Sequence, residues 1–395
     1  MRILFLAYHG FSEYSGISKK IYSQVKGLRE NGHDVRLCHY GFSPEGHRCR
    51  YVDDRVIQDY GLGRLAAIRQ RLGYRCVLDY CLREGIELVY ARSFHNASPW
   101  LVSLFRKLRQ AGIPAVTEIP TYPYDAEYTS DMALSMRMGF WIDRLFRHSL
   151  ARQMSAIVTF SDAAQIFGRK TIRISNGVDF DSTPLHAPFP AAPNPLHLIG
   201  VAEVHSWHGF DRLIAGMGLY YQEARRNGRI PRDVCFHIVG GVDAPYMYGN
   251  SKQEGFQTLV DRYGLHGHVI FHGPLFGTAL DSVFARCQLA IGSLARHRSG
   301  ITHIKTLKNR EYATRGIPFV YSECDSDFDT QPYVLKVPAD ETPIDIGQLI
   351  RFADSREWNP GDIRRSVARL SWKVQMGQVV SAVAALLQTD GLEQS

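Results

Sequence analysis

The sequence lacks the features that mark several classes of protein. Its 395 residues contain no run of 18 apolar residues, so we expect no membrane-spanning helix. The seven cysteines are odd in number and scattered, and none form a Cys-x-x-Cys pair. This pattern argues against a disulfide framework or a zinc site and favours a reducing compartment. The N-terminal segment 1–7 is too short for a signal peptide. Together these absences predict a cytoplasmic protein.

The chain also lacks a strong charge imbalance. It has 46 basic and 39 acidic residues, a net charge of +7, which favours anionic ligands or an anionic membrane surface over a dedicated nucleic-acid partner. We predict basic helices at 62–84 and 132–154, in which Arg residues alternate with apolar ones. Such helices can lie on the inner face of an anionic membrane. The alternative is that their basic faces are simply solvated and their apolar faces lie in the core.

No Gly-x-Gly-x-x-Gly motif follows the first predicted strand, which disfavours a nicotinamide site. Residues 2–38 nevertheless predict a strand, a helix beginning near Gly16 and a second strand. A similar series follows a segment with five prolines between residues 184 and 195, which we interpret as a linker. The fold class is therefore α/β, with two doubly wound Rossmann-like domains. We predict domains at 1–185 and 186–374, with a C-terminal helix, 375–395, joining the first.

The most informative stretch is residues 307–320. It predicts a helix that ends at Gly316, followed by Pro318 and a buried strand. A polar loop, 294–300, precedes it, and such a loop before a helix N-terminus is where α/β folds bind phosphates. Glu311 and His303 are predicted on one side of the helix, where Glu311 can accept hydrogen bonds from a ribose. The alternative for Glu311 is a helical ion pair with Lys308 or Arg315.

Glu-Tyr-Ala-Thr-Arg-Gly-Ile-Pro-Phe-Val, at 311–320, resembles the Glu-x-x-x-x-Gly-x-Pro-Val-Val segment of retaining glycosyltransferases with the GT-B fold, the "group 1" family. The preceding Leu-Lys-x-Arg-Glu-Tyr resembles a polysaccharide-biosynthesis branch, and 176–179, 208–214 and Ser371-Trp372 resemble further family signatures. The resemblance implies two Rossmann-like domains facing a cleft. It also implies transfer of a sugar from a nucleotide diphosphate sugar to a saccharide or lipid-linked saccharide, with retention of configuration and without a metal or other cofactor.

The chain departs from the family pattern at several positions. His303 stands in place of the first of two glutamates, Glu203 in place of an Arg and His208 in place of a Lys, while a donor-sugar His is missing at Pro120. The resemblance therefore suggests that the donor phosphates are held mainly by the loop 296–305. The predicted donor-binding residues are Gly16, Arg296, Arg298, Gly300, Lys305, Lys308 and Glu311. The predicted catalytic residues are His208, His303 and, as a substitute for the missing His, Glu118. The alternatives are a plain helix-entry role for His208 and a turn at Gly16.

The aromatic, proline-containing loop 119–125 follows a predicted strand, where α/β proteins bind ligands. Tyr122, Tyr124 and Asp125 are our acceptor-side candidates, because sugars favour aromatic faces and carboxylates; the alternative is a rigid surface loop. The base of the nucleotide is expected near 273–276. Two other functions remain open. One is an epimerase or phosphorylase on the same fold, because a fold does not fix a function. The other is a degenerate, non-catalytic nucleotide-sugar binder.

Overall fold

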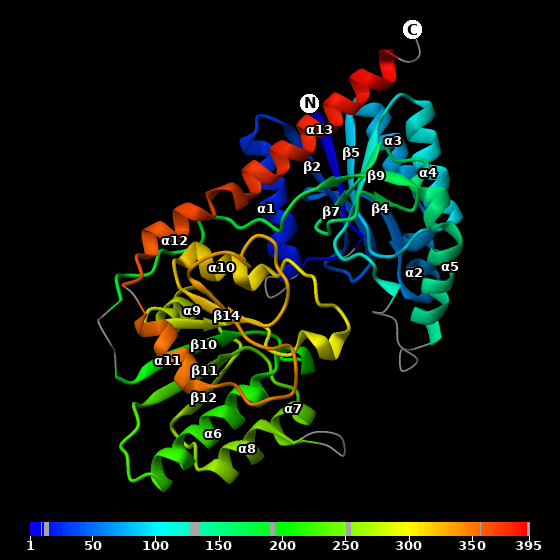
Figure 1. The fold of residues 1–395 in the computed structure, drawn as a ribbon. Helices are drawn as coiled ribbons and strands as arrows, with labels where there is room; N and C mark the ends of the chain where they lie inside the picture. The colour runs from blue at the N-terminus through cyan, green and yellow to red at the C-terminus, as the bar shows by residue number, and fades with distance from the viewer. Residues whose placement is uncertain are drawn as a thin grey trace. The chain divides into compact units, whose positions relative to one another are not determined.

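The computed structural model describes residues 1–8, 10–11, 16–125, 134–189, 194–249, 254–355 and 357–392 (Figure 1). The chain divides into two compact units. Unit 1 comprises Met1–Gly177 and Leu370–Ser395, and unit 2 comprises Val178–Arg369. The described part of the proline-rich segment belongs to unit 2, where the His186 backbone N–H donates to the Arg315 carbonyl at 2.8 Å.

Unit 1 is built on a nine-stranded sheet in the order β4-β3-β2-β1-β5-β6-β7-β9-β8. Its elements are β1 (Arg2–Leu6), α1 (Gly16–Glu30), β2 (Asp34–Phe42), β3 (Arg48–Val52), β4 (Arg55–Gly61), α2 (Gly63–Leu72), α3 (Arg75–Arg83), β5 (Leu88–Arg92), α4 (Pro99–Gln110), β6 (Ala115–Ile119), α5 (Leu134–Ala151), β7 (Ala156–Thr159), β8 (Gln165–Ile166), β9 (Arg169–Arg173) and α13 (Trp372–Leu392). The six neighbouring strands β2, β1, β5, β6, β7 and β9 are parallel. The outer strands β3, β4 and β8 pair antiparallel with their neighbours.

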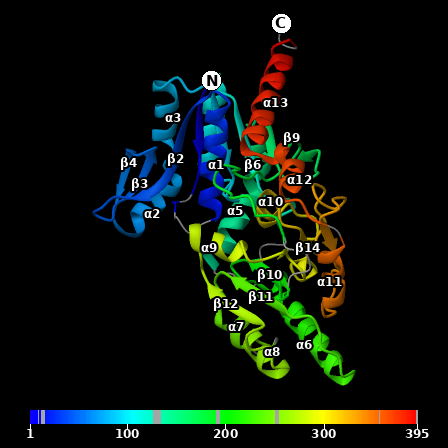
Figure 2. The same ribbon diagram turned by 90° about the vertical axis from the view of Figure 1, so that its left-hand side faces the viewer.

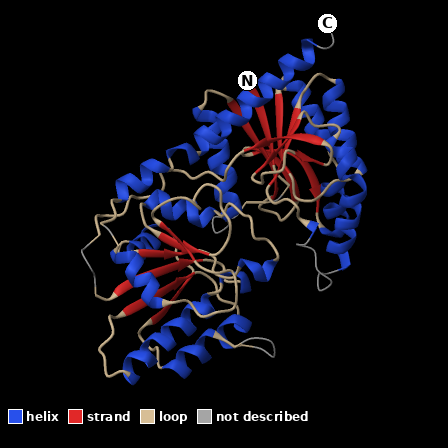
Figure 3. Ribbon diagram, in the orientation of Figure 1, coloured by secondary structure: helices blue, strands red, loops and turns tan. Residues whose placement is uncertain are grey.

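The central strands of unit 1 are apolar on both faces because both faces are covered by helices. Residues of α1 and α13 pack on one face, and residues of α3 and α4 pack on the other. Figure 3 shows the resulting layers of helix, strand and helix. A C-terminal helix that belongs to the first domain is thus present in the structure.

The predicted basic helix 62–84 is wrong as a single element, because it is two helices. Gly73 has an extended conformation (φ −88°, ψ 93°), and its N–H closes α2 by donating to the Arg69 carbonyl. A Cβ at Gly73 would lie 2.7 Å from that carbonyl oxygen. The second predicted basic helix is observed as α5; residues 132 and 133, which we also assigned to it, lie outside the described residues.

Helices α1 and α13 approach each other at Gly27. A Cβ at this position would lie 2.6 Å from the backbone carbonyl of Trp372, and backbone atoms cannot move aside cheaply. We expect Gly27→Ala to lower the free energy of unfolding by about 1–3 kcal/mol. Gly139→Ala in the exposed part of α5 is the control, because no atom of the described residues lies within 4 Å of its Cβ position. Denaturant unfolding should show a lower midpoint for Gly27→Ala and an unchanged or slightly raised one for Gly139→Ala. Equal midpoints would show that the two helices separate without cost.

Unit 2 is built on a parallel, six-stranded sheet in the order β12-β11-β10-β13-β14-β15. Its elements are β10 (Leu196–Val201), α6 (Phe210–Arg226), β11 (Val234–Val239), α7 (Ala244–Tyr248), α8 (Phe256–Tyr263), β12 (Val269–Gly273), α9 (Gly277–Phe284), β13 (Leu289–Ile291), α10 (Leu307–Arg315), β14 (Phe319–Tyr321), β15 (Val334–Lys336), α11 (Ile346–Asp354) and α12 (Pro360–Ser366). Figure 2 shows α6, α7 and α8 grouped beside β11 and β12. Apolar residues of α6 and α8 pack with those of the strands and of α11 to form the main core of the unit.

The two alternating series of strands and helices confirm the predicted α/β class. Within the described ranges, none of the helices combines the length and the apolarity needed to cross a bilayer.

Candidate functional site

Three neighbouring strands of unit 2 bring polar residues to one edge of the sheet. Because β10, β13 and β14 run parallel, the loops that follow them meet at their carboxyl ends. Backbone hydrogen bonds tie these loops together. The Leu294 N–H donates to the His208 carbonyl at 2.9 Å, and the Ser322 N–H donates to the Ser293 carbonyl at 2.8 Å. The loops are therefore joined to one another at this edge of the sheet.

Helix α10 begins beside these loops, and no described side chain caps its N-terminus, which we call open. Its N-cap residue, Thr306, makes no side-chain capping bond, and the first turn contains no acidic residue. The Oγ1 atom of Thr306 and the Nζ atom of Lys308 are buried and have no hydrogen-bond partner within the described residues. The free N–H groups and the positive end of the helix dipole attract an anion. An ammonium group in the first turn strengthens that attraction.

Lys308 faces a second buried ionisable group, Glu323, in the loop after β14. Burial lowers the pKa of Lys308 to about 7, although the Glu323 carboxylate opposes this effect. Burial likewise raises the pKa of Glu323. The Asn309 amide holds Glu323 in place by donating to its Oε1 at 3.1 Å. A phosphate bound at the helix N-terminus would favour the protonated, charged form of Lys308, because an opposite charge nearby stabilises an ion.

His208 lies next to this group as a neutral imidazole. It is only 6% exposed. Burial, together with the positive charges of Lys308 and Arg296, holds its pKa well below the ordinary value. Its Nδ1 accepts a hydrogen bond from the His205 N–H at 2.9 Å, so the proton of the neutral ring is on Nε2. His208 is therefore equipped to donate a hydrogen bond rather than to supply a full charge.

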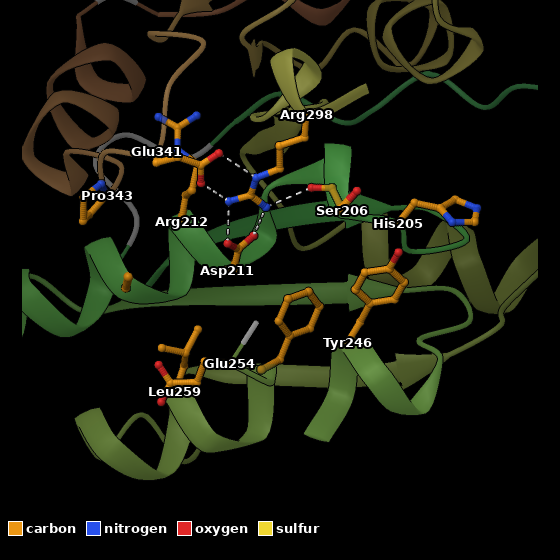
Figure 4. A pocket seen from close by; sticks show the side chains of 12 residues that line it. His205, Ser206, Asp211, Arg212, Tyr246, Glu254, Leu259, Arg298, Glu341 and Pro343 are labelled. Carbon is orange, nitrogen blue, oxygen red and sulfur yellow. Dashed lines mark hydrogen bonds and ion pairs between the residues drawn. The ribbon is translucent and has the colours of Figure 1, made fainter. Parts of the chain in front are cut away.

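Arg298 does not join Lys308 in the structure. Its guanidinium makes a two-pronged pair with Asp211, at 3.0 and 2.8 Å, and also binds Glu341. The hydrogen bonds to these carboxylates raise its pKa. These residues line a separate cavity of about 380 Å³ beside α6 and α8 (Figure 4). Its other lining residues include His205, Ser206, Tyr246 and Phe256.

The remaining loop residues that we predicted also lie in unit 2. Arg296 is in a short 3-10 helix, and Gly300 follows this helix with φ +67°. Lys305 is half-buried just before α10.

The structure corrects the predicted relation between His303 and Glu311. Helix α10 begins only at Leu307, so His303 is not on it. Residues 302–304 instead pair with Cys324 through backbone hydrogen bonds, and the exposed His303 ring lies 3.1 Å from the Thr302 hydroxyl. An extended segment orients its side chains with a period of two, so the helical spacing that we assumed does not apply.

Glu311 makes the helical ion pair that we considered as the alternative, with Arg315. The Glu311 Oε1 atom lies 2.9 Å from both Nε and Nη2 of Arg315. Arg315 is itself held by Asp281 at 2.8 Å and by the ring of Phe284, whose centroid lies 4.0 Å from the guanidinium. Glu311 remains partly exposed, with 35% of its side chain accessible. The pair therefore positions a carboxylate at the surface, and its predicted contact with a ribose stays a prediction.

In unit 1, Gly16 is the first residue of α1 and is exposed. Glu118 is fully buried at the end of β6. Its carboxylate lies 3.2 Å from the Lys20 ammonium and 3.4 Å from Arg92, and it accepts hydrogen bonds from Gln24 and Tyr90. Burial alone would raise its pKa, but the two cations and the two hydrogen bonds together outweigh burial and hold the pKa below its usual value. No part of Glu118 reaches the surface, so its observed role is to pair buried charges; a catalytic role stays untested.

The three acceptor-side candidates differ in how deeply their side chains are buried. Tyr124 is 3% exposed, donates to the Asp143 carboxylate at 2.8 Å and stacks on His95. Tyr122 is half-buried, and Asp125 is exposed and pairs with Arg147 at 2.9 Å. The buried Tyr124 thus anchors the loop 119–125, and Tyr122 and Asp125 are the accessible residues among the three candidates.

Comparison with known proteins identifies the architecture. Residues 15–166 match the family model of the glycosyl transferase 4-like domain. The solved catalytic domain of starch synthase IV from Arabidopsis thaliana, bound to ADP and acarbose, superposes with a TM-score of 0.58 over 98% of this chain and 99% of its own, at 12% identity. Sucrose-phosphate synthase from Thermosynechococcus elongatus gives 0.53 over 100% and 98%, at 14% identity, and the avilamycin A glycosyltransferase AviGT4 gives 0.54 over 98% and 98%, at 15% identity. The fold is GT-B. No curated protein sequence matches this chain.

Three buried polar residues at the site, Ser293, Asn309 and Glu323, were not predicted from the sequence. Ser293 and Glu323 each stand two residues beyond the end of a strand, β13 and β14. Their place at the carboxyl end of a parallel strand is a signal that we did not use. Asn309 carried no such signal, because its importance depends on its contact with Glu323, fourteen positions away.

Proposed function

We propose that this protein is a glycosyltransferase that moves a sugar from a nucleotide diphosphate sugar to a saccharide or lipid-linked saccharide. The proposed reaction retains the anomeric configuration, requires no metal and contributes to polysaccharide or glycoconjugate synthesis. The family match of residues 15–166 and the GT-B fold support the transferase class. Starch synthase IV, which shares the fold, binds ADP, and the motif at 311–320 supports the retaining branch.

The observation that carries the proposal is the open N-terminus of α10 together with the buried amino group of Lys308, which has no hydrogen-bond partner in the part of the chain that the structure describes. A nucleotide diphosphate is the leaving group of such a reaction, and negative charge develops on it as the glycosidic bond to the sugar breaks. Helix N–H groups and an ammonium in a site from which water is largely excluded stabilise that charge without reorganising. His208, with its proton on Nε2, adds a neutral donor. Together these groups can replace the Arg and Lys that the family has at Glu203 and His208.

The other site residues take complementary parts in this proposal. Glu311, held by Arg315, accepts hydrogen bonds from the donor ribose. Tyr122 and Asp125, in unit 1, contact the acceptor.

The test of the phosphate site is Lys308→Met. A hydrogen bond that involves a charged group contributes roughly 1.5–3 kcal/mol, so its loss should weaken nucleoside diphosphate binding by about 10- to 150-fold. Binding of the corresponding nucleoside, which lacks phosphates, should change little. The base is chosen first by thermal shift with UDP, GDP and ADP, because a bound ligand raises the unfolding temperature. Calorimetry then gives the two dissociation constants.

The matched control is Lys26→Met, which removes a partly exposed lysine of α1 that pairs with Glu30 at 3.8 Å. It should leave both dissociation constants unchanged. If Lys308→Met weakens the nucleoside as much as the diphosphate, Lys308 does not bind the phosphates.

A degenerate nucleotide-sugar binder is the second candidate, and the departures from the family pattern at Pro120, Glu203 and His208 favour it. An epimerase on the same fold is a third. Incubation with UDP-, GDP- and ADP-sugars, with and without a chelator, separates the three. Slow release of free sugar and nucleotide indicates a transferase. Binding without release indicates the degenerate form, and interconversion of sugar epimers indicates an epimerase.

A further inference from the structure

Helix α5 in unit 1 exposes an apolar stripe to solvent. Leu134, Met138, Trp141 and Leu145 recur at intervals of three and four residues, so at about 100° per residue they fall within an arc of about 60°. Their side chains are between 58% and 70% exposed. A helix of a globular protein normally turns such a stripe toward the core. Here the stripe has no cover within the described residues.

The opposite side of α5 is the anchored side. Asp143 lies roughly opposite Trp141 on the helix and is 2% exposed. Its carboxylate accepts hydrogen bonds from the Ala97 N–H at 2.9 Å and from the Tyr124 hydroxyl at 2.8 Å. Leu150 and Ala151 are also buried. The helix thus buries its acidic residue and exposes its tryptophan, and these contacts determine which side faces outward.

The exposed side of α5 carries only positive charge. Arg137 and Arg144 are exposed and flank the apolar stripe on one side, and Asp143 is the single acidic residue in the sequence of the helix. This combination of a tryptophan, large aliphatic side chains and arginines without acids suits the boundary of an anionic bilayer. It suits a second copy of the same helix poorly, because the arginines would repel each other.

Helix α2 repeats the pattern. Leu65 and Ile68 are exposed, and the helix contains Arg64, Arg69 and Arg71 but no acidic residue. Figures 1 and 2 both show α2 level with α5 in unit 1. Two helices of the same unit therefore expose apolar residues beside arginines alone.

We propose that unit 1 docks on an anionic lipid surface through the outer face of α5, with α2 as a second contact. Trp141 and the aliphatic residues of the stripe enter the boundary between headgroups and acyl chains. Arg137 and Arg144 bind the lipid phosphates. The inference is independent of the proposed reaction, because it depends only on the surface of unit 1.

The experiment is co-sedimentation of the full chain with vesicles of phosphatidylcholine alone and of phosphatidylcholine with phosphatidylglycerol. We expect binding to the anionic vesicles only, and loss of most of it at about 1 M salt, where charges are screened beyond about 3 Å. Each arginine near an anionic surface contributes about a factor of five in affinity, so Arg137→Gln/Arg144→Gln should lower the partition coefficient by roughly 30-fold. Trp141→Ala/Leu145→Ala should lower it by roughly 10-fold or more.

The matched controls make the same changes on unit 2. Arg225→Gln/Arg226→Gln removes two exposed arginines at the end of α6, and Leu219→Ala/Ile230→Ala removes two exposed apolar side chains. Both should bind vesicles like the unchanged protein. Nucleotide binding, measured by thermal shift, should be the same in all five proteins, which separates this inference from the proposed function.

Three results would overturn the proposal. Equal binding to neutral and anionic vesicles, or no binding, would remove the anionic lipid surface as the partner. Equal losses in the α5 variants and the unit 2 controls would show that net charge or apolarity acts without a specific face. A dimer in sedimentation that Trp141→Ala/Leu145→Ala converts to monomer, without vesicle binding, would instead identify the face as an interface between copies.

Discussion

Arg310→Met should lower the free energy of unfolding by about 3–5 kcal/mol. The Arg310 side chain is fully buried in α10. Its guanidinium binds both oxygens of Asp325, one of them at 2.9 Å, and also binds Asp327 and the Thr306 carbonyl at 3.1 Å. Removing one partner from a buried ion pair leaves the other charge buried without compensation, which accounts for the size of the loss.

The loss is measured by denaturant unfolding followed by circular dichroism. Arg365→Met is the control, because Arg365 and its partner Asp362 are 74% and 64% exposed and such pairs contribute at most about 1 kcal/mol. A second variant tests the cause. Arg310→Met/Asp325→Asn also removes one of the buried carboxylate charges that Arg310→Met leaves uncompensated. It should therefore recover part of the lost free energy of unfolding. If the double variant is less stable than Arg310→Met, uncompensated charge is not the reason.

Glu311→Ala should weaken binding of the nucleotide diphosphate sugar by about 10- to 150-fold. This range follows from the roughly 1.5–3 kcal/mol contributed by a hydrogen bond to a charged acceptor. Glu311→Gln keeps an acceptor oxygen but loses the charge, so it should fall between. The fold should survive, because the side chain is partly exposed and Arg315 keeps its contacts with Asp281 and Phe284. Calorimetry on the folded variants gives the donor dissociation constants.

Asp281→Ala is the matched control for this experiment. Asp281 binds the same arginine at 2.8 Å and is 33% exposed, close to the 35% of Glu311. It should therefore disturb Arg315 as much as Glu311→Ala does but leave donor binding nearly unchanged. If Glu311→Ala binds the donor normally, Glu311 serves only its ion pair, which contributes about 0.2–0.5 kcal/mol to the helix.

The local structure around Glu311 could be predicted from the sequence. Helix α10 ends at Arg315, Gly316 follows with φ +77°, and the strand β14 covers Phe319–Tyr321. Each of these features depends on neighbouring residues: good helix formers, a glycine that tolerates the left-handed conformation, and a proline that stops the helix. The alternation of such segments also sufficed to predict the α/β class.

Only the tertiary structure decided the contacts between residues that are distant in the sequence. Periodicity indicates which side of a helix or strand a residue occupies, but not which group will lie opposite it. Burial lowers the pKa of Lys308 against the opposing effect of the Glu323 carboxylate, and Arg298 pairs with Asp211 and Glu341 instead of joining Lys308. The sequence by itself therefore determined the alternation of strands and helices and the helix that begins the site, although it did not separate the two helices within 62–84. The pairing of buried charges came from the packing of loops at one sheet edge, because desolvation and Coulomb attraction depend on distance in space and not along the chain.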